Sequence, residues 1–308
     1  MKRSNWLDYV VSAEDAGLTV EKIVKEKLAV SGRMLQRLTR SKGVLLNRKA
    51  PFLQKTVKEG DTVSVRVADK AREQENEVVD YDPSFQPDIL FEDEHFLMIN
   101  KPAGLMVHPT SPGQKGTLVQ LLTAWLAHHG KQSTIHAVHR LDKETSGTIL
   151  FGKSGYAHQL ADRMLREGTI KREYIAILCG QLTEEKGTIR AAIGRDPLHH
   201  TRRRVTEKGD DAVTHYEVMA RSDRYTLARV WLDTGRTHQI RVHFQHVGCP
   251  LAGDRLYGGS TADFGRQALH AYRLSFAHPV GGEPIEVTAR LPEDLSQLMV
   301  AQFAVTLE

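Results

Sequence analysis

The sequence has only two cysteines in 308 residues, Cys179 and Cys249, and they form no Cys-x-x-Cys pair. This scarcity argues against a disulfide framework and against a thiolate zinc site. No run approaches the 18 consecutive apolar residues of a transmembrane helix, and the first residues lead into acidic ones rather than an apolar signal core. We therefore expect a cytoplasmic protein that has no membrane partner.

Charge of neither sign dominates the chain. Forty-two Lys and Arg residues against 38 Asp and Glu leave a net charge of +4 and a pI of about 9.0. Such a balance is compatible with a polyanionic partner but does not require one. A length of 308 residues with 40% hydrophobic residues indicates two domains and enough apolar side chains for a core.

The N-terminal part carries two patterns typical of short helices, over residues 18–28 and from Ser31 to Gly43. Arginines recur at i, i+4 and i+7 on the polar side of the second helix, at Arg33, Arg37 and Arg40. This spacing aligns three guanidinium groups on one stripe, for which phosphate is the natural partner. A solvated basic face would give the same pattern.

Two strands are expected next, over residues 44–47 and 63–67. The helix-helix-strand-strand order resembles the alpha-L (S4-like) RNA-binding module, in which a basic second helix lies against RNA. The resemblance depends on Ser31-Gly32-Arg33, Gly43-Val44-Leu45-Leu46-Asn47 and Val57-Lys58-Glu59-Gly60-Asp61. We expect an extension over residues 1–17, this module over 18–70, a polar acidic linker over 71–86 and a second domain over 87–308.

The second domain alternates patterns typical of strands with a few helical ones. Helical spacing occurs over residues 118–126 and 157–165, and strand patterns occur over 89–91, 96–100, 174–178, 215–219, 226–232 and 240–244. These patterns predict an α+β fold whose mixed, largely antiparallel sheet has peripheral helices.

The most informative stretch is His139-Arg140-Leu141-Asp142-Lys143-Glu144-Thr145-Ser146-Gly147. Apolar strands are expected on both sides of it, so Asp142 would lie on a loop held by the core. A turn whose side chains bond nearby backbone groups would also explain an Asp before Thr-Ser-Gly. His139 and Arg140 have no obvious role in such a turn, which favours a functional site.

A second signal comes from residues 234–243, where Gln239, Arg241 and His243 alternate with apolar residues in an expected strand. A buried guanidinium needs an anion, and Asp142 is the obvious carboxylate for Arg241, either in a site or in a structural ion pair. Tyr174 begins another apolar strand. Its ring offers a flat face for a base, although a lone tyrosine in a strand is more often a core residue.

Asp142, Tyr174 and Arg241, with their flanking residues, resemble the three signature motifs of the RluA/RluD family of pseudouridine synthases. The resemblance runs from about residue 87 to 291. It includes Lys101-Pro102-Ala103-Gly104, His139-Arg140-Leu141-Asp142, Thr145-Ser146-Gly147, Thr234-Gly235-Arg236-Thr237-His238-Gln239-Ile240-Arg241 and Gly253-Asp254-Arg255-Leu256-Tyr257-Gly258.

The resemblance implies that uridine in RNA is isomerised to pseudouridine without a cofactor. Asp142 would be the catalytic aspartate, either attacking the ribose or removing a sugar proton, and Arg241 would favour and orient its ionised form. Tyr174 would stack on the flipped uracil and assist removal of the proton from carbon 5. His139 and Arg140 would contact the substrate.

No metal is expected, although His136 and His139, and likewise His243 and His246, are spaced at i, i+3. Both pairs fall on segments expected to be strand or loop, where this spacing does not bring ligands together as it does on a helix. The absence of a G-x-G-x-x-G fingerprint agrees with a reaction that needs no cofactor.

Arg203 and Arg204 lie in a turn-rich connection over residues 195–208, which is either a second phosphate contact or a solvated loop. From the family we expect RNA as the partner of a monomer, with large-subunit ribosomal RNA as substrate and tRNA as an open alternative. Two other classes compete: a non-catalytic RNA-binding factor for ribosome assembly, and a metal-dependent hydrolase.

Overall fold

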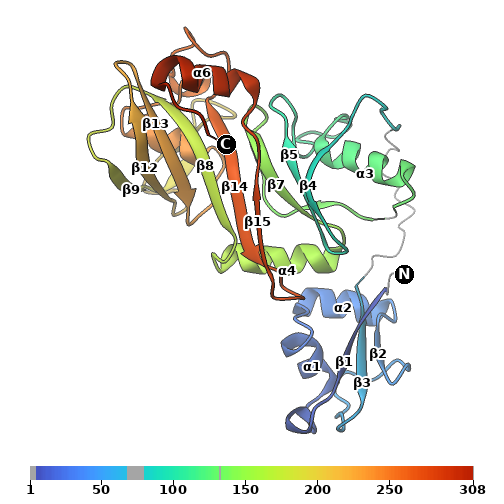
Figure 1. Cartoon of the computed structure of the whole chain (residues 1–308). Helices are drawn as coiled ribbons and strands as arrows, with labels where there is room; N and C mark the ends of the chain where they lie inside the picture. The colour runs from blue at the N-terminus through green and yellow to red at the C-terminus, as the bar shows by residue number, and fades with distance from the viewer. Residues whose placement is uncertain (1–4, 68–79, 132, 308) are drawn as a thin grey trace.

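The computed structural model describes residues 5–67, 80–131 and 133–307 (Figure 1). Residues 5–67 form a small unit around a three-stranded sheet, called here the N-terminal unit, and residues 88–307 form a large unit around a ten-stranded sheet. Residues 80–87 contain no helix or strand, and residues 71–79 of the expected linker lie outside the described residues. No described helix is long and apolar enough to cross a membrane.

The N-terminal unit contains both expected helices and both expected strands. Its elements are β1 (Trp6–Val10), η1 (Ala13–Asp15), α1 (Val20–Glu26), α2 (Gly32–Arg40), β2 (Val44–Leu46) and β3 (Thr62–Arg66). Helix α2 begins as expected at Ser31, whose hydroxyl accepts a hydrogen bond from the backbone N–H of Met34. The apolar side of α2 is buried: Met34, Leu35 and Leu38.

Strand β1 lies within residues 1–17, which were predicted to be an extension. It pairs antiparallel with β3 along its whole length, from Trp6 opposite Arg66 to Val10 opposite Thr62. The extension is therefore wrong for these residues, which complete the sheet. β1 is only half-buried and its partner lies more than fifty residues later, so no local pattern indicates the pairing.

The large unit contains the remaining elements. They are β4 (Asp88–Glu92), β5 (Phe96–Lys101), α3 (Leu118–His128), β6 (His136–Ala137), β7 (Ser146–Gly152), α4 (Gly155–Arg166), β8 (Lys171–Cys179), β9 (Lys186–Arg190), β10 (Ile193–Arg195), β11 (Arg203–Val205), β12 (Val213–Arg221), β13 (Tyr225–Leu232), α5 (Gln239–His246), η2 (Arg255–Tyr257), β14 (Leu269–Ala277), β15 (Pro284–Thr288) and α6 (Glu293–Phe303).

The large sheet is mixed and largely antiparallel, as predicted. Its main path is β4-β5-β7-β14-β8-β13-β12-β9, with β15 also paired to β14 and β6 to β7. Strands β7 and β14 pair in parallel, and the other pairs of this sheet are antiparallel among the described residues. The α+β class is therefore confirmed.

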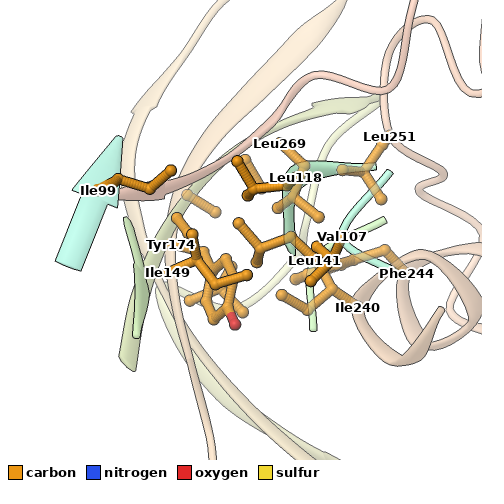
Figure 2. Close-up of a cluster of buried hydrophobic side chains, with 14 of the residues drawn as sticks. Ile99, Val107, Leu118, Leu141, Ile149, Tyr174, Ile240, Phe244, Leu251 and Leu269 are labelled. Carbon is orange, nitrogen blue, oxygen red and sulfur yellow. The ribbon is translucent and has the colours of Figure 1, made fainter. Parts of the chain in front are cut away.

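Helices cover both faces of this sheet, so its central strands are buried on both sides. On β5, Leu97 and Ile99 pack with α3, whereas Phe96 and Met98 pack with α4. The cluster on the α3 face also contains Tyr174 of β8 and residues of α5 (Figure 2). This face carries the site described below.

The segment 240–244, predicted to be a strand, lies instead in α5, so that prediction is wrong. Six successive residues of α5, Gln239 to Phe244, are buried. A helix buried on all sides has no polar face, so its apolar positions do not show the 3.6-residue period. The buried polar side chains find partners: His243 bonds Thr214 Oγ1 at 2.8 Å and the carbonyl of Ala191 at 2.9 Å.

Candidate active site

Asp142 lies on the predicted loop between β6 and β7, and two contacts fix the turn around it. The backbone N–H of Thr145 donates to the carbonyl of Asp142 at 3.1 Å, and Lys101 Nζ donates to the carbonyl of Lys143 at 3.0 Å. At the start of β7, Gly147 has φ +112°, and a Cβ there would lie 2.2 Å from the carbonyl oxygen of Ala271. Only glycine fits this approach of β7 to β14.

Arg241 of α5 contacts two carboxylates. Its Nη1 donates to Asp142 Oδ2 at 2.9 Å, while Nε and Nη2 donate to the two oxygens of Asp254 at 2.7 and 2.9 Å. Burial alone would lower the pKa of Arg241, but the hydrogen bonds and charges of Asp254 and Asp142 outweigh it and raise that pKa. The predicted pairing of Arg241 with Asp142 is confirmed, with Asp254 as an additional partner.

Tyr174 lies on β8 with its ring buried in the cluster of Figure 2. Burial raises the pKa of its hydroxyl, an effect that the charge of Arg172 opposes and that of Asp142 reinforces. The phenol is therefore neutral at physiological pH, available as a hydrogen-bond donor and a poor base.

These three residues line one cavity of about 570 Å³. This volume suits a small organic ligand of the size of a nucleoside. His139, Arg140, Arg172 and His238 line the same cavity. The arrangement places a fixed carboxylate, a guanidinium that balances its charge and an aromatic ring around one space.

His139 is buried and its Nε2 accepts a hydrogen bond from the backbone N–H of Leu150 at 3.2 Å. Burial lowers its pKa to about 3, so the ring is neutral. Arg140, the next residue, is exposed. Of this predicted substrate-binding pair, His139 therefore supports β7 through the backbone, whereas Arg140 is free to meet a ligand at the edge of the cavity.

His238, Tyr257 and Asp254 are further site residues that were not predicted from the sequence. Tyr257 accepts a hydrogen bond from the backbone N–H of Arg203 at 2.9 Å, so its own proton is available to His238 Nδ1 at 2.8 Å. In that tautomer the ring proton is on Nε2, and this nitrogen lies 3.9 Å from Asp142 Oδ2, beyond hydrogen-bond distance. All three residues lie in runs that carry the family resemblance, which was the signal available.

His238 also has a left-handed backbone conformation, with φ 59° and ψ 21°, directly before α5. Such a conformation is unfavourable for a residue with a side chain and is typical of constrained sites. Burial lowers the pKa of His238 despite the charge of Asp142, so its ring is neutral.

The remaining predicted contact residues lie outside the cavity. Arg33, Arg37 and Arg40 are exposed on α2 of the N-terminal unit. Arg203 and Arg204 lie on β11, which forms a hairpin with β10 rather than a turn-rich loop. Arg204 is exposed, and Arg203 is linked to the site through its bond to Tyr257.

One run imitates a phosphate-binding loop without forming one. Residues 147–154, Gly-Thr-Ile-Leu-Phe-Gly-Lys-Ser, have the spacing of such a loop. Residues 146–152 form the buried strand β7, however, and the buried Lys153 pairs with Glu92 at 2.8 Å. This lysine has no access to a phosphate.

Comparison with known proteins gives the family. The family described as RNA pseudouridylate synthase matches residues 95–246. The Bacillus subtilis (strain 168) protein "Uncharacterized RNA pseudouridine synthase YhcT" is 40% identical over 306 residues, covering 98% of this chain and 99% of that protein. "Ribosomal large subunit pseudouridine synthase D" of Nitrosomonas europaea is 36% identical over 310 residues, covering 97% and 89%.

Among solved structures, "Human RNA Pseudouridylate Synthase Domain Containing 1" matches with a TM-score of 0.57 and 26% identity, over 67% of this chain and 84% of that one. The chain therefore belongs to the RluA/RluD family of pseudouridine synthases, as the motifs predicted. It is an RNA pseudouridine synthase, an isomerase.

Proposed function

We propose that this protein isomerises specific uridines of large-subunit ribosomal RNA, as a cytoplasmic monomer and without a cofactor, and that Asp142 is the catalytic carboxylate. One observation carries the assignment of the site: Asp142, held at 2.9 Å by Arg241, shares a cavity with the ring of Tyr174. The ribosomal substrate is supported by relatives such as that of Nitrosomonas europaea, whose name specifies the large subunit.

In the proposed reaction the bond between N1 of uracil and C1′ of ribose breaks, the uracil turns, and C5 joins C1′. C5 then loses its proton to solvent and N1 takes up a proton, so the product is an isomer of the substrate. Asp142 acts in its ionised form, either by attacking C1′ or by removing the proton from C2′. Arg241 orients this carboxylate, and Asp254 in turn fixes Arg241 through two hydrogen bonds. His238 presents its Nε2–H toward Asp142.

Tyr174 would stack on the flipped uracil. Because burial raises the pKa of its hydroxyl, we assign Tyr174 the ring contact and a hydrogen bond rather than the removal of the C5 proton. Arg140 would contact the RNA at the edge of the cavity, while His139 supports the loop of Asp142 from β7.

The N-terminal unit would act as an S4-like RNA-binding module whose helix α2 lies on the phosphate backbone. It docks on α4, which lies between this unit and the large sheet in Figure 1. Tyr156 donates its hydroxyl to the carbonyl of Leu28 at 2.9 Å, and Gln159 bonds the carbonyl of Ala29 at 2.7 Å and the N–H of Ser31 at 2.8 Å. These bonds fix the start of α2 relative to the catalytic unit.

The decisive experiment maps pseudouridines in cellular RNA with and without the gene, with Asp142→Asn as a complementing variant. We expect a site in large-subunit ribosomal RNA that disappears without the gene, returns with the wild type and does not return with Asp142→Asn. If a pseudouridine in tRNA disappears without the gene instead, tRNA replaces large-subunit ribosomal RNA as the assigned substrate. Full activity of Asp142→Asn would refute the mechanism, and an unchanged map would favour a non-catalytic assembly factor.

The basic stripe has its own test. The triple variant Arg33→Gln, Arg37→Gln and Arg40→Gln should bind large-subunit ribosomal RNA more weakly and lower the slope of log K against log salt by about 2 to 3. The triple variant Lys22→Gln, Lys55→Gln and Lys58→Gln removes the same charge from exposed positions elsewhere in the unit. Equal slopes for the two variants would show that the stripe is a solvated face.

A further inference from the structure

Arg172 of β8 is a buried guanidinium that has no carboxylate partner among the described residues. The residue is 9% exposed. Over the described parts of the chain, no acidic side chain comes within ion-pair distance of it. Its Nε is buried with no hydrogen-bond partner, and its Nη2 reaches only the carbonyl of Thr234, at 3.5 Å. A buried, permanently charged group that lacks hydrogen-bond partners is strongly unfavourable unless an anion binds to it.

The guanidinium lies between two hollows of the large unit. Residues 172 and 174 lie two apart on one strand, so Arg172 and Tyr174 share a face of the sheet. Arg172 lines the cavity of Asp142 and also a second hollow of about 600 Å³. It packs over the turn before α5, since a Cβ on Gly235 would lie 3.1 Å from its Nη1.

Among the described residues that line the second hollow, the buried Arg172 and the exposed Lys171 have no carboxylate partner. The acidic side chains that line it already have basic neighbours: Glu173 with Arg229 at 3.3 Å, Glu286 with Arg273 at 3.6 Å, Asp233 with His215 at 2.9 Å and Glu167 with Arg163 at 4.0 Å. Exposed Lys171 adds positive charge beside Arg172, and exposed Trp231 offers an apolar ring. The wall between the two hollows therefore attracts an anion.

We infer that Arg172 binds a phosphodiester of the substrate RNA, at the point where the strand passes between the Asp142 cavity and the second hollow. This inference rests on the proposed function for the identity of the RNA. The planar guanidinium can donate two parallel hydrogen bonds to phosphate oxygens. Arg172 differs in this respect from Arg241, whose three nitrogens each already donate to Asp142 or Asp254.

The first test is stability, because a structural arginine and a ligand-binding arginine behave in opposite ways. Arg172→Gln removes an uncompensated buried charge, so the thermal midpoint in the absence of RNA should stay the same or rise. Arg229→Gln serves as the matched control, since Arg229 lies on the adjacent strand β13 and pairs with Glu173. A large drop in the midpoint for Arg172→Gln alone would show that Arg172 supports the fold and would overturn the inference.

The second test measures RNA binding separately from turnover, in an Asp142→Asn background with an unmodified transcript of large-subunit ribosomal RNA. Adding Arg172→Gln should raise the Kd by about ten- to a hundredfold. It should also lower the salt slope by about 0.7 to 0.9, the value for one phosphate contact. Adding Arg229→Gln should change neither quantity. Equal Kd and salt slope for the two variants would overturn the inference.

The third test locates the phosphate. A stem-loop carrying the mapped uridine is made with one methylphosphonate linkage at a time. One linkage should weaken binding to the Asp142→Asn protein but have no further effect once Arg172→Gln is added, because the contact is already lost. Additive effects at every linkage would overturn the inference.

The outcomes separate the two proposals. If the wild type forms pseudouridine while Arg172→Gln binds RNA as Arg229→Gln does, the phosphate contact fails and the proposed function stands. If the wild type forms no pseudouridine in the transcript while Arg172→Gln still loses affinity, the proposed function fails and the phosphate contact stands.

Discussion

Replacing Asp254 by Asn should destabilise the protein far more than replacing Asp142 by Asn, although both residues bind the same arginine. Asp254 is 1% exposed in its side chain and makes two hydrogen bonds to Arg241, whereas Asp142 is 16% exposed and makes one. Breaking the buried pair should cost about 3–5 kcal/mol. Loss of the partly solvated pair between Asp142 and Arg241 should lower the free energy of unfolding by at most about 1 kcal/mol, because Asp254 still balances the charge of Arg241.

Urea unfolding at pH 7 measures this difference directly. Asp294→Asn is the matched control: Asp294 binds Arg266 through the same two-bond geometry, at 2.8 and 2.9 Å, but its side chain is 48% exposed. Its loss should cost no more than about 1 kcal/mol. The reasoning is refuted if Asp254→Asn unfolds at the same urea concentration as Asp142→Asn or Asp294→Asn.

Three further predictions concern stacking, pH and docking. Tyr174→Phe keeps the ring and should retain kcat within about tenfold, whereas Tyr174→Leu should lower kcat by about a hundredfold or more, since stacking is worth about 1–3 kcal/mol per base. Release of tritium from [5-³H]uridine-labelled RNA measures kcat for both variants. Equal losses of kcat would contradict a stacking role. Burial lowers the pKa of His270 to about 4, so the unfolded state binds a proton that the folded state lacks and stability rises from about pH 4 to 6.5. His270→Asn should reduce this slope by up to about 1.4 kcal/mol per pH unit, seen in urea midpoints, and an unchanged slope would rule out this origin. Tyr156→Phe leaves the carbonyl of Leu28 without its donor and should cost about 1 kcal/mol, with faster amide exchange in α1 and α2; unchanged exchange would contradict docking through this bond.

The local environment of Asp142 could be predicted because its signals are close together in the chain. Apolar residues on both sides of 139–147 indicated two strands, and the structure has β6 and β7 there. The partnership of Asp142 with Arg241 also followed, since a guanidinium within an apolar stretch requires an anion. Physical chemistry of single residues was sufficient for these steps.

Other parts of the site depend on contacts between distant residues and were therefore missed. In the sequence, Asp254 is simply an acidic residue near glycines, and only the tertiary structure shows that it binds Arg241. The same limit explains α5, where six successive buried residues hide the helical period, and β1, whose partner strand lies far along the chain. Arg172 was unremarkable for the same reason, because the absence of a partner is a property of the folded structure.

The close parallel contact of Gly147 with Ala271 also has a consequence for synthesis of the chain. Ser146 lies opposite His270, 124 residues later, and Arg241 and Asp254 also follow Asp142 by about a hundred residues. At about 5 to 20 residues per second, a ribosome adds these 124 residues in roughly 6 to 25 seconds. Throughout that interval Asp142 has already been synthesised but β14 has not. The nascent chain therefore cannot act on RNA. Activity begins only when the strand that receives Gly147 has been made.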